Sequence, residues 1–452
     1  MARTRALFSE SPSKLRKYLI MAAVCVPLAF ATAWWLQPGP QATTSGLTNV
    51  YFLPAETYMA GEVDFLRDES GNARIDSILL PELPQQNVAT SDFLSAGYLG
   101  AQTCAECHQE YFDSFVKTSH FKTSAEPSDQ SILGAFDDAH RVLTTVSENL
   151  RFEMLDGDGE FWQRLLYDDG QQTHGVEFQF GLVTGSGKVG QTYLYWQESL
   201  LYQMHVSYLS VTDSWTNSPG YRDGTADFAR PIPALCLDCH ATYFEEVAGN
   251  INQFQRDNYV LGVTCEKCHG PGREHVAYHR DHPQEMTAHG IVNPAELPTE
   301  RAIEVCQVCH GGTPVAMLQP AFSFRPGDRL DHFFTFSENM QATGVHSNSQ
   351  LPRLRQSKCF QQSPDMTCTT CHAPHEFERG DLQLFSQRCQ NCHDLPDCGK
   401  FGELGNTIAD NCIDCHMPSR ELEDIKISSQ GADHAPLMRD HFIKVWPSTT
   451  AH

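Results

Sequence analysis

The sequence predicts an α-rich fold with little regular secondary structure, interrupted by a β-rich insert in its first half. Three observations carry this prediction. One pattern, Cys-x-x-Cys-His, occurs seven times in the 452 residues. Six of the occurrences lie between Cys236 and His416, with roughly 30 residues for each. The 127 residues between the first and second occurrences contain no such pattern, and much of this stretch has a strand-like composition.

The repeated pattern is the attachment signature of c-type haem. Two thiols add across the two vinyl groups of one porphyrin, and the imidazole of the next residue binds the iron. At this composition, chance would give roughly 0.03 occurrences. A zinc site would not need a histidine after every pair of cysteines, and a disulfide scaffold would not repeat one spacing seven times. The predicted cofactors are therefore seven covalently attached haem c groups with their iron.

The residues of the seven motifs have two predicted roles. The cysteines that attach the cofactor are Cys104, Cys107, Cys236, Cys239, Cys265, Cys268, Cys306, Cys309, Cys368, Cys371, Cys389, Cys392, Cys412 and Cys415. The histidines that bind the iron on the attachment side are His108, His240, His269, His310, His372, His393 and His416. No residue is predicted to be catalytic.

The charge of the chain excludes one class of partner. Lys and Arg total 32 against 56 Asp and Glu, which gives a net charge of −24. Nucleic acid is therefore not expected as a partner, because phosphate binding needs clustered positive charge. An acidic surface instead suits docking to basic patches on other proteins.

The N-terminal segment is typical of an export signal. Several Arg and Lys residues precede the segment Leu19–Leu36, which contains no charge. A basic flank followed by 18 apolar residues indicates either a Sec signal sequence or a single membrane anchor over 1–36, and Ala31-Thr32-Ala33 offers a cleavage site. In both cases the rest of the chain is exported. We expect a periplasmic protein, tethered to the inner membrane where the segment is retained.

The chain after residue 36 divides into four predicted parts. Residues 37–98 form a Pro/Gly/Ser/Thr-rich linker and an extended segment, and residues 99–127 carry the first haem. Residues 128–230 form the β-rich insert, because Val, Tyr, Phe and Thr alternate around a Gly-Ser-Gly turn. Residues 231–452 form a six-haem domain whose haems must make up much of the core. Pro298, before the stretch TERAIEVCQVCH, predicts a helix that runs into the fourth motif.

Low-spin haem needs a second axial ligand, and imidazole suits iron. Fourteen of the 21 histidines remain after the motifs are assigned. His375 follows His372 by three residues and cannot reach the opposite face of the same iron, so it would serve another haem. His120, His275, His375 and His441 are the leading second ligands. Lower-ranked candidates are His279, His282, His332, His346 and His434, followed by His140, His174 and His205.

Two exported cysteines, Cys359 and Cys398, fall outside the motifs. Cys359 is open to several interpretations: a thiolate ligand, a reactive thiol, an inert buried thiol, or half of a disulfide with Cys398.

The motif segments also resemble a known family. They are GVTCEKCHGPGREH at 262–275, MTCTTCHAPH at 366–375 and NCIDCHMP at 411–418. They resemble the exported multihaem c-type cytochromes of the cytochrome c-554 type, which belong with the octahaem enzymes that process hydroxylamine and tetrathionate. The resemblance implies an α-rich multihaem cytochrome c fold with stacked haem pairs and mostly bis-histidine ligation. This chain departs from the family by having seven motifs rather than four or eight.

Three functions are compatible with these features. The first is a carrier that passes electrons through its haems on the periplasmic side of a bacterial membrane, between redox partners such as a membrane quinol-oxidising complex or other cytochromes. The second is an oxidoreductase that acts on a small nitrogen or sulfur compound. The third is a structural electron conduit within a larger complex. The sequence leaves open whether the protein is an enzyme.

Overall fold

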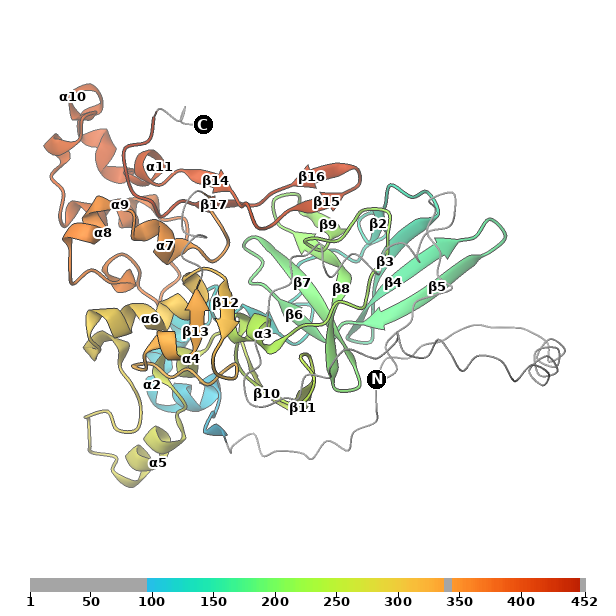
Figure 1. Cartoon of the computed structure of the whole chain (residues 1–452), viewed down its shortest axis with the longest axis horizontal. Coiled ribbons are helices and arrows are strands. Elements are labelled where there is room, and N and C mark those ends of the chain that lie inside the picture. Colours follow the sequence, from blue (N-terminus) through green and yellow to red (C-terminus); the bar gives the residue numbers. More distant parts are fainter. Residues whose placement is uncertain (1–95, 337–343, 448–452) are drawn as a thin grey trace, which may run out of the picture.

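The computed structural model describes residues 96–336 and 344–447 (Figure 1). It contains 27% helix and 27% strand, so the prediction of an α-rich fold is wrong. Several small sheets occur among the motifs as well as in the insert. The predicted export segment Leu19–Leu36 and the linker up to residue 95 lie outside the described residues.

Several helices are short because the chain leaves the helical conformation at a motif histidine. Four helices end on such a histidine: α3 (Ala234–His240), α4 (Cys265–His269), α6 (Thr299–His310) and α11 (Ile413–His416). In α2 (Ala101–Phe115), His108 has non-helical dihedrals of φ −119° and ψ 43°. The helix expected before the fourth motif is confirmed as α6. Six motifs in so short a stretch therefore do not make a helical domain.

The remaining helical segments are also brief. The α-helices are α5 (Arg273–Asp281), α7 (Gln350–Leu354), α8 (Lys358–Gln362), α9 (Leu382–Gln390) and α10 (Phe401–Leu404). The 3₁₀ turns are η3 (Pro294–Glu296), η4 (Leu330–His332), η6 (Cys368–Thr370), η7 (Leu395–Asp397) and η8 (Gly405–Asp410).

Two antiparallel sheets make up the strand-rich part of the chain, on the right of Figure 1. One has the order β2-β3-β4-β5, formed by β2 (Val142–Thr144), β3 (Leu150–Gly157), β4 (Glu160–Asp168) and β5 (Thr173–Gln179). The other has the order β1-β6-β7-β8-β9, formed by β1 (Ser124–Ala125), β6 (Leu182–Thr184), β7 (Gly190–Gln197), β8 (Leu200–Leu209) and β9 (Ser214–Asn217). Strands β2 to β9 fall within the predicted insert, whereas β1 comes from the first-haem segment.

The two sheets pack through an aromatic and aliphatic core. Residues alternate between buried and partly exposed along β3 and β4, which places one face of that sheet against the core. Phe152 from β3 and Tyr193 from β7 are completely buried in it. Every residue of β8 is buried, because a second core lies on the other side of this strand.

The second core joins the insert to the motif-bearing part of the chain. Trp196 and Leu201 of the insert share it with residues of α3, α6 and two hairpins, among them Phe254 and Phe334. These hairpins are β10 (Ala241–Glu246) with β11 (Phe254–Leu261), and β12 (Pro314–Met317) with β13 (Phe334–Phe336).

The C-terminal strands tie the far end of the chain to the insert. They pair as β14 (Ser419–Glu421) with β17 (Leu437–Arg439), and as β15 (Ile427–Ser429) with β16 (Ala432–His434). The β15–β16 hairpin reaches β9, where Asn217 Nδ2 donates to the carbonyl of Ser428 at 2.7 Å (Figure 1). In the part of the chain that the structure describes, no helix has the length and apolarity to cross a membrane.

Candidate haem-binding site

All seven motifs open onto one continuous cavity of about 3290 Å³. Every motif cysteine and motif histidine lines it, as do His120, His275, His375 and His441. All fourteen motif thiols are free. A pocket for one cofactor-sized ligand measures roughly 300–1,000 Å³, so this cavity has room for several such groups. The space and the donor set therefore fit covalently attached haem.

Each leading second-ligand candidate lies opposite a motif histidine. The ring centres are 6.3 Å apart for His108 and His275, 6.1 Å for His120 and His310, 6.0 Å for His269 and His375, and 6.3 Å for His372 and His441. Two imidazoles bound on opposite sides of one iron, at about 2 Å for each bond, have ring centres roughly 6 Å apart. The four observed spacings match that value.

In each pair, one segment supplies the motif histidine and a different segment supplies its counterpart. His275 from α5 follows the third motif but faces the first, and His120 follows the first motif but faces the fourth. His375, just after the fifth motif, faces the third motif at His269. His441 comes after the last motif and faces the fifth. Sharing of residues between segments in these four pairs helps to explain how so few residues per motif can enclose the cofactors.

Hydrogen bonds at Nδ1 set the orientation of several of these rings. The contacts are His269 to the Val292 carbonyl (2.8 Å), His310 to Gln350 Oε1 (3.0 Å), His416 to the Lys444 carbonyl (3.0 Å), His275 to the His289 carbonyl (3.0 Å) and His441 to the Arg439 carbonyl (3.1 Å). An oxygen acceptor at Nδ1 requires the proton there, which leaves the Nε2 lone pair for a metal.

Burial favours the neutral form of the rings that a metal needs. Burial, followed by the nearby His310, lowers the pKa of His120 to about 4. Burial, followed by the nearby His372, lowers the pKa of His441 to about 4. Both rings are therefore neutral at pH 7, and neutral imidazole is the form that binds iron.

The other three motif histidines lack such a counterpart. Among the described residues, no second histidine ring lies at this spacing from His240, His393 or His416. His240 ends α3 beside the second core, and its carbonyl accepts hydrogen bonds from Thr123 and Ser124 at 2.8 Å each.

Among the lower-ranked histidines, His140, His174 and His205 lie on the insert and do not line the cavity, whereas His279 lines it. His140 pairs with Asp137, and His174 pairs with Asp169, both on the insert. His205 is fully buried and stacks on Phe152 at 4.6 Å in the core of the insert. His279 packs against His275 at 4.6 Å, and its Nε2 is buried.

The motifs lie next to one another in space. Thiols of different motifs are in hydrogen-bonding contact for Cys104 with Cys265, Cys239 with Cys309, and Cys306 with Cys368. Cys392 lies near enough to Cys371 to raise its pKa by charge repulsion, and Cys412 acts in the same way on Cys389. Lys267 Nζ in the third motif donates to Asp238 Oδ1 in the second at 2.5 Å. The seven attachment sites therefore form one contiguous set.

The two remaining exported cysteines, Cys359 and Cys398, are free thiols. The disulfide considered from the sequence is therefore not formed. Cys359 lies near Cys371 and Cys389, and Cys398 lies near Cys412.

Sequence reasoning missed the groups that orient the histidines. Gln350 lies 40 residues from His310, and Val292 and Lys444 act through their backbone carbonyls. A backbone carbonyl leaves no trace in residue type, so no sequence signal identifies the last two. Gln350 follows no motif and carries no spacing that could have singled it out.

Comparisons with known proteins agree with this site. A family model described as "Cytochrome c554 and c-prime" matches residues 211–270. The chain is 19% identical over 388 residues to the dissimilatory sulfite reductase MccA of Wolinella succinogenes, covering 71% of this chain and 50% of that protein. It is 26% identical over 180 residues to the C-type polyheme cytochrome OmcC of Geobacter sulfurreducens, covering 34% of this chain and 21% of that protein.

In its sequence and its seven motifs, the chain is similar to multihaem c-type cytochromes. Covalently bound haem c, with its iron, is its prosthetic group. The chain spans half or less of the length of these two relatives. Among solved structures, it is similar to the outer cell wall cytochrome OcwA, with 15% identity and a TM-score of 0.49 over 77% of this chain and 80% of that one. It is also similar to an undecaheme cytochrome from the S-layer of Carboxydothermus ferrireducens, with 16% identity and a TM-score of 0.34 over 78% and 52% of the two chains.

Proposed function

We propose that this cytochrome binds seven haem c groups and conducts electrons along them between redox partners. The observation that carries the proposal is the set of four histidine pairs at 6.0–6.3 Å, each joining two different motif segments. Bis-histidine haem is low-spin and exchanges single electrons without needing an open position on the iron. A set of such sites, in which each pair joins two motif segments, suits an electron carrier rather than a catalyst.

The contacts between motifs support a continuous route. Starting from the first motif, the neighbouring attachment sites are the third, then the fourth, the fifth, the sixth and the seventh. The second motif contacts the fourth through Cys239 and Cys309. Cys107 at one end of this order is exposed, and so are Cys392 and Cys415 at the other. Electrons would then enter at one exposed end and leave at the other.

We also propose a periplasmic location, with residues 19–36 as the inner-membrane tether or export signal. The basic flank and the uncharged segment support this location, and c-type haem is attached outside the cytoplasm. A membrane quinol-oxidising complex or other cytochromes are the proposed partners. The net charge of −24 suits docking to basic surfaces, so electron exchange should slow as salt is raised.

A second candidate function is reduction or oxidation of a small nitrogen or sulfur compound. His240, His393 and His416 support it, because each lacks a histidine counterpart among the described residues. An iron with a free or water-bound position is what catalysis would need. One relative is named a dissimilatory sulfite reductase, which makes sulfite the first compound to test.

Haem counting and ligand challenge test these proposals. Intact mass and the pyridine haemochrome assay should give seven covalent haems per chain, and extraction of haem by acid acetone would contradict covalent attachment. Sulfite, nitrite and hydroxylamine are then added to the oxidised protein. A high-spin signal that shifts with one of them, together with turnover, favours the enzyme. An unchanged spectrum favours the carrier. Assembly that depends on concentration would instead favour a conduit shared between copies.

A further inference from the structure

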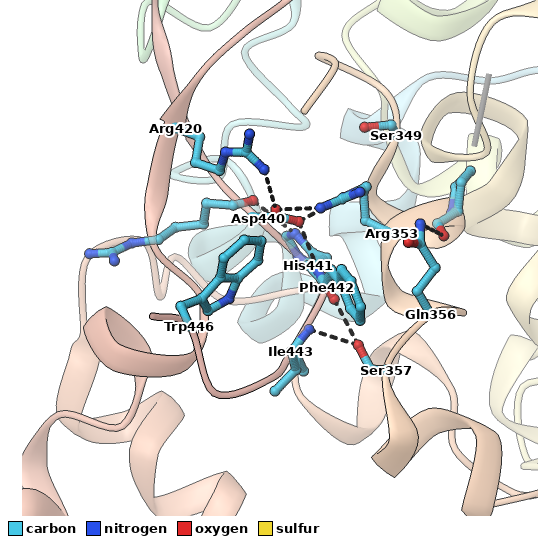
Figure 2. A network of polar contacts seen from close by, with 12 residues as sticks. Ser349, Arg353, Gln356, Ser357, Arg420, Asp440, His441, Phe442, Ile443 and Trp446 are labelled. Atoms are coloured by element: carbon cyan, nitrogen blue, oxygen red, sulfur yellow. Dashed lines mark hydrogen bonds and ion pairs between the residues drawn. The ribbon is translucent and has the colours of Figure 1, made fainter. Parts of the chain in front are cut away.

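The turn that carries His441 is held by a buried carboxylate. Asp440 is completely buried, and its Oδ1 accepts the backbone N–H of Phe442 at 2.9 Å, which closes a turn around His441 (Figure 2). Arg353 in α7 binds the same carboxylate in bidentate fashion, through Nε at 2.8 Å and Nη2 at 2.6 Å. This is the geometry in which an arginine–carboxylate pair fixes orientation best.

A second contact holds the backbone of the turn from the other side. The buried Ser357 hydroxyl donates to the carbonyl of His441 at 3.1 Å and accepts the N–H of Ile443 at 2.8 Å (Figure 2). Arg420 adds a weaker contact to Asp440 Oδ2 at 3.3 Å. Residues 440 to 443 are thus fastened to the segment 353–357, which precedes the fifth motif.

The cavity distinguishes the ligand from its supports. Among the described residues that line it, His441 is present, whereas Arg353, Asp440 and Ser357 are not. The supporting residues therefore act on the cavity through the turn, whose residues His441, Phe442 and Ile443 all line it. The ring centre of His441 is 6.3 Å from that of His372. Burying an arginine and a carboxylate costs desolvation, and a neutral packed core would avoid that cost. The buried ion pair fixes the position of the turn, which a neutral packed core would do less precisely.

We infer that Arg353, Asp440 and Ser357 form a clamp that positions His441 as the second ligand at the fifth motif. This inference rests on the proposed ligand pairs. The clamp keeps the ring opposite His372 during oxidation and reduction, so that an outside ligand cannot take its place. Asp440 and Ser357 act here as positioning residues, and Arg353 anchors Asp440.

Binding of carbon monoxide by the fully reduced holoprotein tests the clamp, because this ligand needs a vacated iron position. Arg353→Lys keeps the charge and loses the bidentate contact, whereas Ser357→Ala removes only neutral hydrogen bonds. Each variant should bind carbon monoxide at the affected haem at least ten times faster than the wild type, and added imidazole should suppress the gain. Arg301→Lys is the matched control. Its side chain is 14% exposed and pairs with Glu304 at 2.6 Å, and neither residue lines the cavity.

The variant His441→Ala distinguishes the ligand role of His441 from the positioning role of the clamp. It should create one carbon monoxide-binding haem per chain beyond the wild type. If it creates none, His441 is not a ligand and the proposed pair fails. If it creates one while Arg353→Lys and Ser357→Ala match the Arg301→Lys control, the clamp is overturned and the ligand pair stands. If Arg353→Lys does not fold, Ser357→Ala decides alone.

Discussion

Replacing His375 by alanine should change one haem and leave the others almost untouched. The His375 ring lies 6.0 Å from that of His269, with an angle of 11° between the planes, so its loss removes one axial ligand. With seven haems per chain, about one-seventh of the total haem should convert from low-spin to high-spin. The midpoint potential of that haem should rise, because an imidazole that stabilises ferric iron is lost. Tyr111 and Phe115 of α2 pack edge-on against the ring, so the change stays local.

The assay is a spectroelectrochemical titration of wild-type protein, His375→Ala and the control His332→Ala. The side chain of His332, in η4, is 66% exposed. Among the described residues, its ring is not paired with the ring of any motif histidine. Added imidazole should return His375→Ala to the low-spin state. If His375→Ala keeps the wild-type spectrum and potentials, a 6.0 Å spacing does not mark a ligand pair, and the interpretation of the other three pairs loses its support.

Three further predictions concern stability, haem tuning and the membrane. Burial lowers the pKa of His205 to about 3. Below pH 6.5, His205 is therefore protonated in the unfolded chain but stays neutral in the folded insert. Stability should fall by about 2 kcal/mol between pH 7 and pH 5, and denaturant unfolding of His205→Gln should lack this component. A slope shared by both proteins would assign the effect to other groups. Gln350→Leu removes the acceptor at His310 Nδ1, so one potential should shift upward while the haem count stays at seven; unchanged potentials would show that the contact tunes nothing. The full-length chain should stay in the membrane fraction through high-salt washing because of residues 19–36, whereas a mature N-terminus beginning near Trp34 would show that the segment is cleaved.

Local sequence spacing was a good guide to the chemistry of the site. The motif pattern is determined by the geometry of one porphyrin, so it can be read within five residues. The proximity of His375 to His372 predicts that His375, as a ligand, would serve another haem, and the structure places its ring opposite that of His269. Which motif each second histidine faces could not be predicted, because the paired residues lie far apart in the sequence, by more than a hundred residues in three of the four pairs, as with His108 and His275.

The helix content was overestimated for a physical reason. Each motif needs only one helical turn to place two thiols, and the chain then bends at the histidine, as at His240, where β10 begins at once. Short hairpins such as β12–β13 occur between successive motifs in the sequence. The Arg353–Asp440 contact could not be predicted from the sequence either, because the partners lie 87 residues apart and neither belongs to a motif.

Electron paramagnetic resonance of the fully oxidised wild-type protein tests the four ligand pairs most directly, because the angle between two axial imidazole planes sets the anisotropy of a low-spin haem. The planes meet at 11°, 21° and 27° in three pairs, and at 64° in the His120–His310 pair. We predict at least four low-spin haems per chain, three with rhombic signals and one with a strongly anisotropic signal that His120→Ala abolishes. More than three high-spin haems per chain in the wild-type protein would contradict the pairing.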